Sequence, residues 1–138
     1  MEKQVVVDTG PLVAFLNRTD RFHAWTQEQW ERVSPPLLTC EPVLAETCFL
    51  LRHLPGGNQA ALELVNRGVI QVTFNLEEEV QPIMKLVKRY ADIPMSLADA
   101  CLVRMAEQHA HSKVLTLDQD FRIYRMHGRQ VIPVITPN

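Results

Sequence analysis

The chain alternates between short apolar runs and longer stretches in which apolar residues recur every three or four positions. The short runs are bounded by polar or turn-forming residues and several are rich in β-branched residues, which is typical of buried strands. The longer stretches have the spacing of amphipathic helices and mostly end at proline or glycine. The predicted strands are residues 5–7, 37–39, 69–74, 114–117 and 131–135, and the predicted helices are residues 11–16, 22–34, 42–50, 58–67, 76–90 and 96–106.

Strands and helices alternate along the whole chain, which is typical of a parallel sheet whose connections pass over both of its faces. We therefore predict an α/β fold, a three-layer α/β/α domain with a mostly parallel central sheet. Pro133 interrupts the last predicted strand, and because proline cannot donate a ladder hydrogen bond, that strand is expected at an edge. No internal repeat, low-complexity tract or long linker divides the sequence, so residues 1–138 are predicted to form a single domain.

The composition is that of an ordinary globular protein, with 46% hydrophobic and 22% charged residues among 138. No apolar run reaches the roughly 18 residues of a membrane span. Residues 1–4 lack a basic and then apolar leader pattern, so we expect a cytoplasmic protein without membrane contact. Cys40, Cys48 and Cys101 have no metal-binding spacing and are predicted to be buried free thiols. The net charge of −2 excludes a globally basic nucleic-acid coat, so contact with nucleic acid would need a local basic rim.

Two acids directly follow predicted strands. Asp8 comes after Val5–Val7, and Asp118 comes after the strand at 114–117. Ligands of open α/β sheets bind outside the carboxyl ends of the strands, so both acids are expected at one functional edge. The alternative for each is an ordinary loop or N-cap residue, a role in which aspartate is common.

Glu46 lies on a predicted helix among apolar neighbours. The positions three and four residues away are Pro42, Val43, Phe49 and Leu50. This spacing predicts that the Glu46 carboxylate shares the buried side of its helix. Such a group is costly to bury unless it is paired or binds a metal, and no lysine or arginine lies at helical spacing from it.

Asp99 repeats this arrangement, with Leu102 and Val103 as apolar neighbours on its helix. We therefore expect its carboxylate to face inward as well. The alternative is a capping box, because Ser96 precedes Asp99 by three residues at the start of the helix. The two roles are compatible with each other.

Four acids in one cleft would repel one another, and each would raise the pKa of the others unless a cation neutralised them. Carboxylate oxygens select a hard divalent ion such as Mg²⁺ or Mn²⁺, whereas zinc prefers histidine or cysteine. His109 and His111 are two positions apart and point to different sides of a helix, so they do not form a zinc pair. The sequence thus predicts an acidic site for magnesium or manganese.

The segments that carry these acids resemble, in order and spacing, the motifs of the PIN-domain ribonucleases, and most closely those of VapC-type toxins from toxin–antitoxin pairs. The resemblance extends over essentially the whole chain. Each segment alone is a weak signal, but the four together are specific. The segments are VVDTGPL at 6–12, PVLAE at 42–46, SLADA at 96–100 and TLDQDF at 116–121.

The resemblance implies a metal-dependent endoribonuclease that hydrolyses RNA phosphodiester bonds with Mg²⁺ or Mn²⁺. It also implies a homodimer and a cognate antitoxin protein as partner. Thr9 is implied to help position the first acid or a metal-bound water, and Thr116 matches the hydroxyl residue of the last motif. In that motif Asp118 directly follows the strand and is favoured over Asp120 as the fourth acid. The implied catalytic and metal-ligating residues are Asp8, Glu46, Asp99 and Asp118.

RNA phosphates need cations, which this slightly acidic chain must gather locally. Arg122 and Arg125 follow the last acidic motif, and Arg18 follows the first helix. We expect these three residues to flank the cleft and contact RNA; the alternative is an ordinary solvated face.

Two other functional classes fit the sequence less well. A catalytically silent PIN-like module that binds RNA or protein would not need all four acids, which this chain retains. A haloacid-dehalogenase-like phosphatase would need a second aspartate where this chain has Gly10, and a response-regulator receiver would need an adjacent acidic pair. Both phosphate-handling folds fit poorly.

Overall fold

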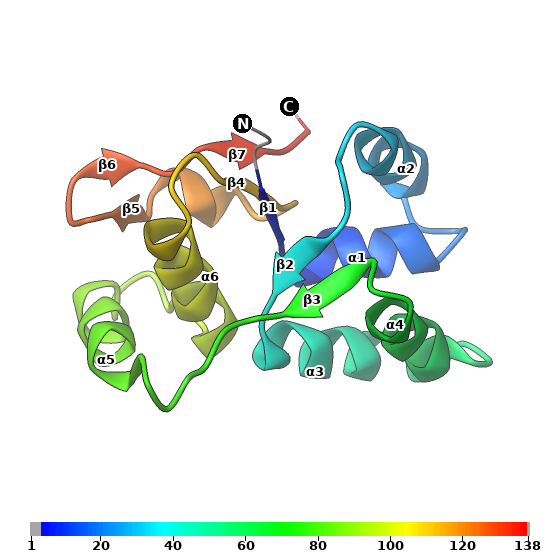
Figure 1. The fold of residues 1–138 in the computed structure, drawn as a ribbon, viewed down its shortest axis with the longest axis horizontal. Helices are drawn as coiled ribbons and strands as arrows, with labels where there is room; N and C mark the ends of the chain where they lie inside the picture. Colours follow the sequence, from blue (N-terminus) through cyan, green and yellow to red (C-terminus); the bar gives the residue numbers. More distant parts are fainter. Residues whose placement is uncertain (1–3, 138) are drawn as a thin grey trace.

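The structure, a computed structural model that describes residues 4–137, is built around a five-stranded sheet (Figure 1). Residues 1–3, which entered the expectation about a leader, lie outside this range. The strand order is β3-β2-β1-β4-β7, and every neighbouring pair is parallel. Because parallel strands end at the same edge, the segments that follow β1 and β4 lie next to each other. The strands are β1 (Val5–Val7), β2 (Leu37–Thr39), β3 (Ile70–Val72), β4 (Lys113–Leu115) and β7 (Val134–Ile135).

Helices cover both faces of this sheet. Helices α1 to α4 lie on one side, and α5 and α6 lie on the other (Figure 1). The predicted three-layer α/β/α architecture with a parallel central sheet is therefore confirmed. The helices are α1 (Thr9–Leu16), α2 (His23–Glu31), α3 (Glu41–Leu50), α4 (Gly57–Asn66), α5 (Val80–Arg89) and α6 (Leu97–Gln108).

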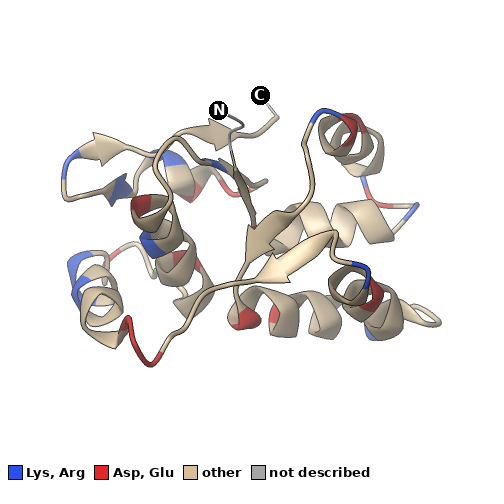
Figure 2. Ribbon diagram, viewed as in Figure 1, with Lys and Arg blue, Asp and Glu red and all other residues tan. Residues whose placement is uncertain are grey.

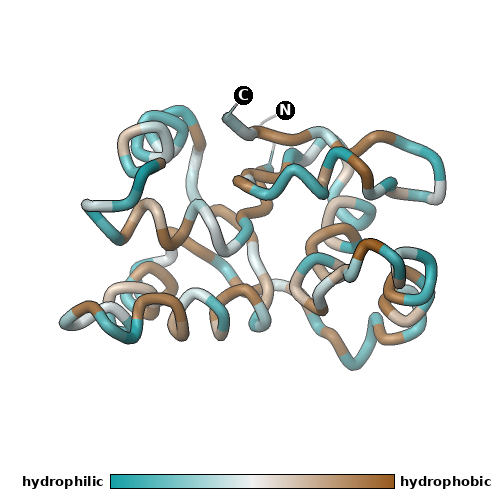
Figure 3. Tube along the Cα trace, turned by 180° about the vertical axis from the view of Figure 1, so that it is seen from behind, coloured by the Kyte–Doolittle hydropathy of each residue, from teal (hydrophilic) through white to brown (hydrophobic). Residues whose placement is uncertain are grey.

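The core lies between the sheet and the inner faces of the helices. The three valines of β1 are buried, and Figure 3 shows apolar strands between helices of mixed hydropathy. Cys40 and Cys101 are buried free thiols, as predicted, whereas Cys48 is half-buried. Within residues 4–137, no helix is both long enough and apolar enough to cross a membrane.

Residues 131–135 form parts of two strands instead of the single predicted one. Pro133 separates β6 (Gln130–Val131) from β7, because proline has no N–H with which to continue the ladder. β6 pairs in antiparallel orientation with β5 (Arg125–Met126), forming a hairpin that the sequence pattern did not predict. β7 is an edge strand of the main sheet, as Pro133 predicted.

Several further bounds differ from the prediction. β3 and β4 are shorter than the strands predicted at 69–74 and 114–117, so Asp118 does not directly follow β4 as predicted. A short 3₁₀ helix, η1 (Gln119–Arg122), follows β4, where no helix was predicted. Helix α5 begins at Val80 rather than near residue 76. The delay has a local cause, because the Asn75 side chain accepts a hydrogen bond from the Glu78 backbone N–H at 3.1 Å and fixes a turn there.

Candidate active site

Asp8 lies at the end of β1, where it is the N-cap residue of α1. The residue is only 7% exposed, and each of its carboxylate oxygens accepts one hydrogen bond. The Thr9 backbone N–H donates to Oδ1 at 2.7 Å, and the Thr116 hydroxyl donates to Oδ2 at 2.8 Å. Asp8 thus combines the capping role with a fixed position at the carboxyl edge of the sheet.

The Thr116 hydroxyl links the first and last acidic motifs. It donates to Asp8 and accepts a hydrogen bond from the Asp118 backbone N–H at 2.9 Å. Thr116 directly follows β4 and is fully buried, so its place beside Asp8 is set by the pairing of β1 with β4. Asp118 in turn caps η1, where its Oδ1 accepts from the Asp120 N–H at 2.9 Å. The structure therefore brings Asp8 and Asp118 to one edge.

Asp99 lies in the first turn of α6 and forms a capping box with Ser96. The Ser96 hydroxyl accepts a hydrogen bond from the Asp99 N–H at 3.0 Å, and Asp99 Oδ2 accepts from the Ser96 N–H at 3.3 Å. The Tyr124 hydroxyl donates to the same Oδ2 at 3.0 Å. The capping alternative is therefore realised, and a second donor from a distant segment holds the same carboxylate.

Burial raises the pKa of Asp8 to about 6. The hydrogen bonds from Thr116 and Thr9 lower this pKa in part, whereas the charges of Asp99 and Asp118 raise it further. Burial also raises the pKa of Asp99, and the charge of Asp118 adds to that increase. Three carboxylates thus influence one another electrostatically, and a cation among them would offset their repulsion.

The donor chemistry of this site suits a hard divalent cation. Asp8, Asp99 and Asp118 offer carboxylate oxygens, which Mg²⁺ and Mn²⁺ prefer. The buried Thr9 hydroxyl has no hydrogen-bond partner within residues 4–137. Over the same range, no three histidine, cysteine, aspartate or glutamate side chains are arranged to hold one ion directly. The acids are therefore electrostatic neighbours without forming a closed shell of ligands, and magnesium or manganese binding stays a prediction.

Residues 5–125 match the PIN-domain family, a range that includes all three acids and Tyr124. The chain belongs to the PIN-domain family. It is similar to ribonuclease VapC26 of Mycobacterium tuberculosis, which is 27% identical over 128 residues that cover 83% of this chain and 87% of the relative. It is also similar to the crystal structure of Mycobacterium tuberculosis VapC20, a sarcin–ricin loop cleaving toxin. That structure has a TM-score of 0.73 and 25% sequence identity, and the match covers 85% of this chain and 92% of VapC20.

These similarities confirm the resemblance that the four sequence motifs indicated. The family match ends at Arg125, so a single domain over the whole of residues 1–138 stays a prediction.

Among the four predicted acids of this PIN domain, Asp8 is buried, Asp99 and Asp118 are half-buried, and Glu46 is exposed. On α3, Val43 and Thr47 are buried, whereas Glu46 is exposed. Phe49 is 59% exposed and Leu50 is 41% exposed. The prediction that Glu46 shares the buried side of its helix is wrong, because its apolar neighbours Phe49 and Leu50 are exposed to solvent and do not belong to the core. Its role as a metal ligand stays a prediction.

The PIN domain uses Asp118 and Asp120 differently. The charge of Asp118 acts on both Asp8 and Asp99, which places it electrostatically with the other acids. Asp120 supplies backbone groups, because its N–H donates to Asp118 and its carbonyl oxygen accepts from the Tyr124 N–H at 3.1 Å. The role of Asp118 as the last acid of the site stays a prediction.

Lysine and arginine residues gather on α5 and around the β5–β6 hairpin (Figure 2). Arg122 is exposed on η1, and its Nε donates to Gln119 at 2.8 Å. Nη1 of Arg125 donates to the carbonyl oxygens of residues 122, 123 and 124, so this side chain also holds the end of η1. Arg18 follows the far end of α1 from Asp8. Contacts of these three arginines with RNA stay predictions.

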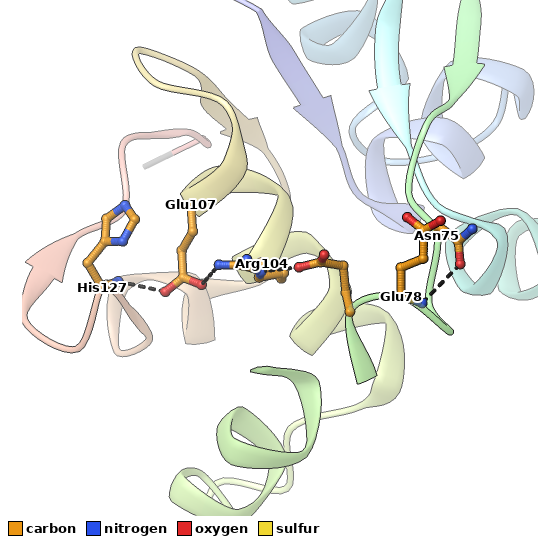
Figure 4. A network of polar contacts seen from close by, with 6 residues as sticks. Asn75, Glu78, Arg104, Glu107 and His127 are labelled. Carbon is orange, nitrogen blue, oxygen red and sulfur yellow. Dashed lines mark hydrogen bonds and ion pairs between the residues drawn. The ribbon is translucent and has the colours of Figure 1, made fainter. Parts of the chain in front are cut away.

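A network of ion pairs fixes the helix that carries Asp99 (Figure 4). Arg104 of α6 donates to Glu79 at 2.6 Å and to Glu107 at 3.2 Å. Glu107 also accepts a hydrogen bond from the His127 backbone N–H at 2.6 Å. These contacts connect α6 to the start of α5 and to the β5–β6 hairpin. They fix α6 in addition to the packing of its buried face.

Tyr124 contacts Asp99 of the site, a contact that the sequence does not predict. The three-residue spacing between Phe121 and Tyr124 is a signal for burial, because it places both rings on one side of a short helical turn. That spacing does not reveal the partner of the hydroxyl, Asp99, which lies 25 residues earlier in the chain.

Proposed function

We propose that this PIN domain is a metal-dependent endoribonuclease of the VapC type, a hydrolase that cleaves RNA phosphodiester bonds. The observation that carries the proposal is the group of Asp8, Asp99 and Asp118 at one sheet edge, with Thr116 joining the first and last acids. The similarity to a VapC ribonuclease and to a sarcin–ricin loop cleaving VapC toxin supports the same reaction.

In the proposed mechanism, Asp8, Asp99 and Asp118 would hold a Mg²⁺ or Mn²⁺ ion, with Glu46 as a further candidate. Such an ion would supply Lewis-acid chemistry for the hydrolysis of the phosphodiester bond. The Thr116 hydroxyl keeps the Asp8 carboxylate in place by donating a hydrogen bond to Oδ2, and the Thr9 N–H donates one to Oδ1. Ser96 holds the Asp99 backbone at the start of α6. The chain thus presents its acids before the substrate arrives, which lowers the reorganisation needed for reaction.

We also propose that the chain is the toxin of a toxin–antitoxin pair, that it forms a homodimer and that it acts in the cytoplasm. Exposed apolar side chains support the presence of protein partners. On α3 these are Phe49 and Leu50, and on α5 they include Met84, which is 59% exposed, and Val87. Apolar side chains grouped on a surface are typical of interaction sites.

Incubation of the purified protein with total cellular RNA tests the proposed reaction. We expect discrete RNA fragments with Mg²⁺ or Mn²⁺ and intact RNA with EDTA. Asp8→Asn and Asp99→Asn are expected to lower the cleavage rate by roughly 100-fold or more, as for other lost groups that act on transition-state charge.

Asp92→Asn is the matched control, because it removes the same charge at an exposed position outside the site. Circular dichroism and thermal melting verify that each variant is folded. If the wild-type protein, freed of any copurified protein, binds RNA but leaves it intact in both metals, the chain is a binding module and the nuclease proposal fails.

A further inference from the structure

Asp99 is held asymmetrically. Its Oδ2 accepts two hydrogen bonds, from the Ser96 N–H at 3.3 Å and from the Tyr124 hydroxyl at 3.0 Å. Within residues 4–137, no donor forms a hydrogen bond with Oδ1. One oxygen of this carboxylate is therefore occupied by the protein, and the other is left for a ligand.

Tyr124 is fixed from several directions. The residue is fully buried, and its ring makes edge contacts with Phe121 at 5.3 Å and with Tyr90 at 5.1 Å between ring centroids. Its carbonyl oxygen accepts a hydrogen bond from Arg125 Nη1 at 3.0 Å. The hydroxyl therefore has little freedom to leave Asp99 Oδ2.

The segment that carries Tyr124 also carries Asp118. Asp118 caps the start of η1, and the Tyr124 N–H donates to the Asp120 carbonyl oxygen at the end of η1. One short turn thus places the last acid and, six residues later, the phenol that holds Asp99 of α6. Movement of this turn would displace two acids of the site together.

We propose that Tyr124 is a positioning residue, whose hydroxyl fixes the Asp99 carboxylate so that Oδ1 is presented to the divalent cation. This inference rests on the proposed metal-dependent function. The alternative is that Tyr124 only fills the core with its ring, in which case the hydroxyl has no influence on the cation. Burial together with the charge of Asp99 raises the pKa of Tyr124, which keeps the hydroxyl protonated and able to donate near neutral pH.

The decisive comparison is between Tyr124→Phe and Tyr90→Phe, each of which removes one hydroxyl from a buried ring. The Tyr90 hydroxyl accepts a hydrogen bond from the Arg125 N–H at 2.9 Å, so this control also loses a buried hydrogen bond. Binding of Mn²⁺ is measured by electron paramagnetic resonance of the free ion, without RNA. We expect Tyr124→Phe to weaken Mn²⁺ binding about 10–100-fold, as is usual for groups that orient metal ligands. Tyr90→Phe is expected to bind Mn²⁺ like the wild-type protein.

A second measurement uses the wild-type chain and does not depend on the folding of a variant. The sequence contains two tyrosines, so a sample labelled with ¹³C at the tyrosine Cζ carbon gives two signals, which Tyr90→Phe assigns. Addition of Mg²⁺ is expected to shift the signal of Tyr124 and to leave that of Tyr90 in place.

The outcomes separate this inference from the proposed function. If the wild-type protein cleaves RNA with Mn²⁺ while Tyr124→Phe binds Mn²⁺ equally well, the positioning role is overturned and the nuclease stands. If Mg²⁺ supports cleavage but its addition leaves the Tyr124 signal in place, the positioning role is overturned as well. If the wild-type protein neither binds Mn²⁺ nor cleaves RNA, the proposed function itself fails.

Discussion

At the scale of single residues, the buried position of Asp8 makes its ionised form energetically unfavourable. The carboxyl is buried between β1 and α1, and burial raises its pKa from the ordinary 3.8 to about 6. Between these two values the folded protein binds more protons than the unfolded chain. The free energy of unfolding therefore falls as the pH rises through this interval, and above it the ionised carboxylate destabilises the fold by about 3 kcal/mol.

Asp8→Asn is expected to remove this dependence. An asparagine side chain can still accept from the Thr9 N–H and can donate to the Thr116 hydroxyl oxygen, so the local contacts are largely retained. We compare the free energies of unfolding of the variant and the wild-type protein without a divalent ion. The difference in favour of the variant should grow by about 3 kcal/mol from pH 4 to pH 7.5. Urea unfolding across this range measures the gain, and parallel curves for the two proteins would contradict the raised pKa of Asp8.

At the scale of elements, the start of α6 depends on one hydroxyl. Ser96→Ala removes the acceptor for the Asp99 N–H and is expected to lower the free energy of unfolding by about 1 kcal/mol. Because Asp99 lies in this first turn, binding of Mn²⁺ should weaken too. Chemical denaturation and Mn²⁺ titration measure the two effects.

Ser34→Ala is the matched control for this variant, because Ser34 is exposed and lies outside the helices. It is expected to stay within about 0.5 kcal/mol of the wild-type stability. Equal unfolding energies for Ser96→Ala and Ser34→Ala would mean that the capping box contributes nothing.

The elements also show what local sequence can predict. The observed bounds of β1 and β2 match the prediction, because each is a compact apolar run closed by residues that leave the sheet. The start of α5 was missed because it depends on the Asn75 turn, and near it the Arg104–Glu79 ion pair joins residues 25 positions apart.

Local sequence also predicts only part of the candidate site. Asp8 and Asp118 could be placed from the sequence, because an acid after a parallel strand lies at the carboxyl edge wherever that strand sits. The exposure of Glu46 could not be predicted, because apolar neighbours such as Phe49 indicate burial whether they contact the core or face outward. The hydrogen bond from Tyr124 to Asp99 joins residues 25 positions apart, which no local pattern contains.

At the scale of the whole molecule, a chain of net charge −2 must bind RNA through a local concentration of cations. Arg122 is the cleanest residue to test, because Arg125 also holds the end of η1 and its replacement would disturb Tyr124. Arg122→Glu is expected to weaken RNA binding and to reduce the slope of log affinity against log salt by about 0.7.

Arg67→Glu is the matched control. Arg67 is exposed before β3, at the opposite edge of the sheet from the acids, and its ion pair with Glu63 is a surface pair of small value. Fluorescence anisotropy of the protein–RNA complex, measured without divalent metal, gives the salt slope of each variant. The same salt slope for Arg122→Glu and the wild-type protein would remove Arg122 from the RNA surface.

The strand order has a consequence for synthesis on the ribosome. β4 pairs with β1 at the centre of the sheet, yet it is translated long after β1. The bond from Thr116 to Asp8 spans 108 residues, so the Asp8 carboxylate has no Thr116 hydroxyl beside it until β4 has left the exit tunnel. Since a nascent chain emerges from its N-terminus, the acidic edge of the sheet forms only after β1, α6 and β4 have all emerged.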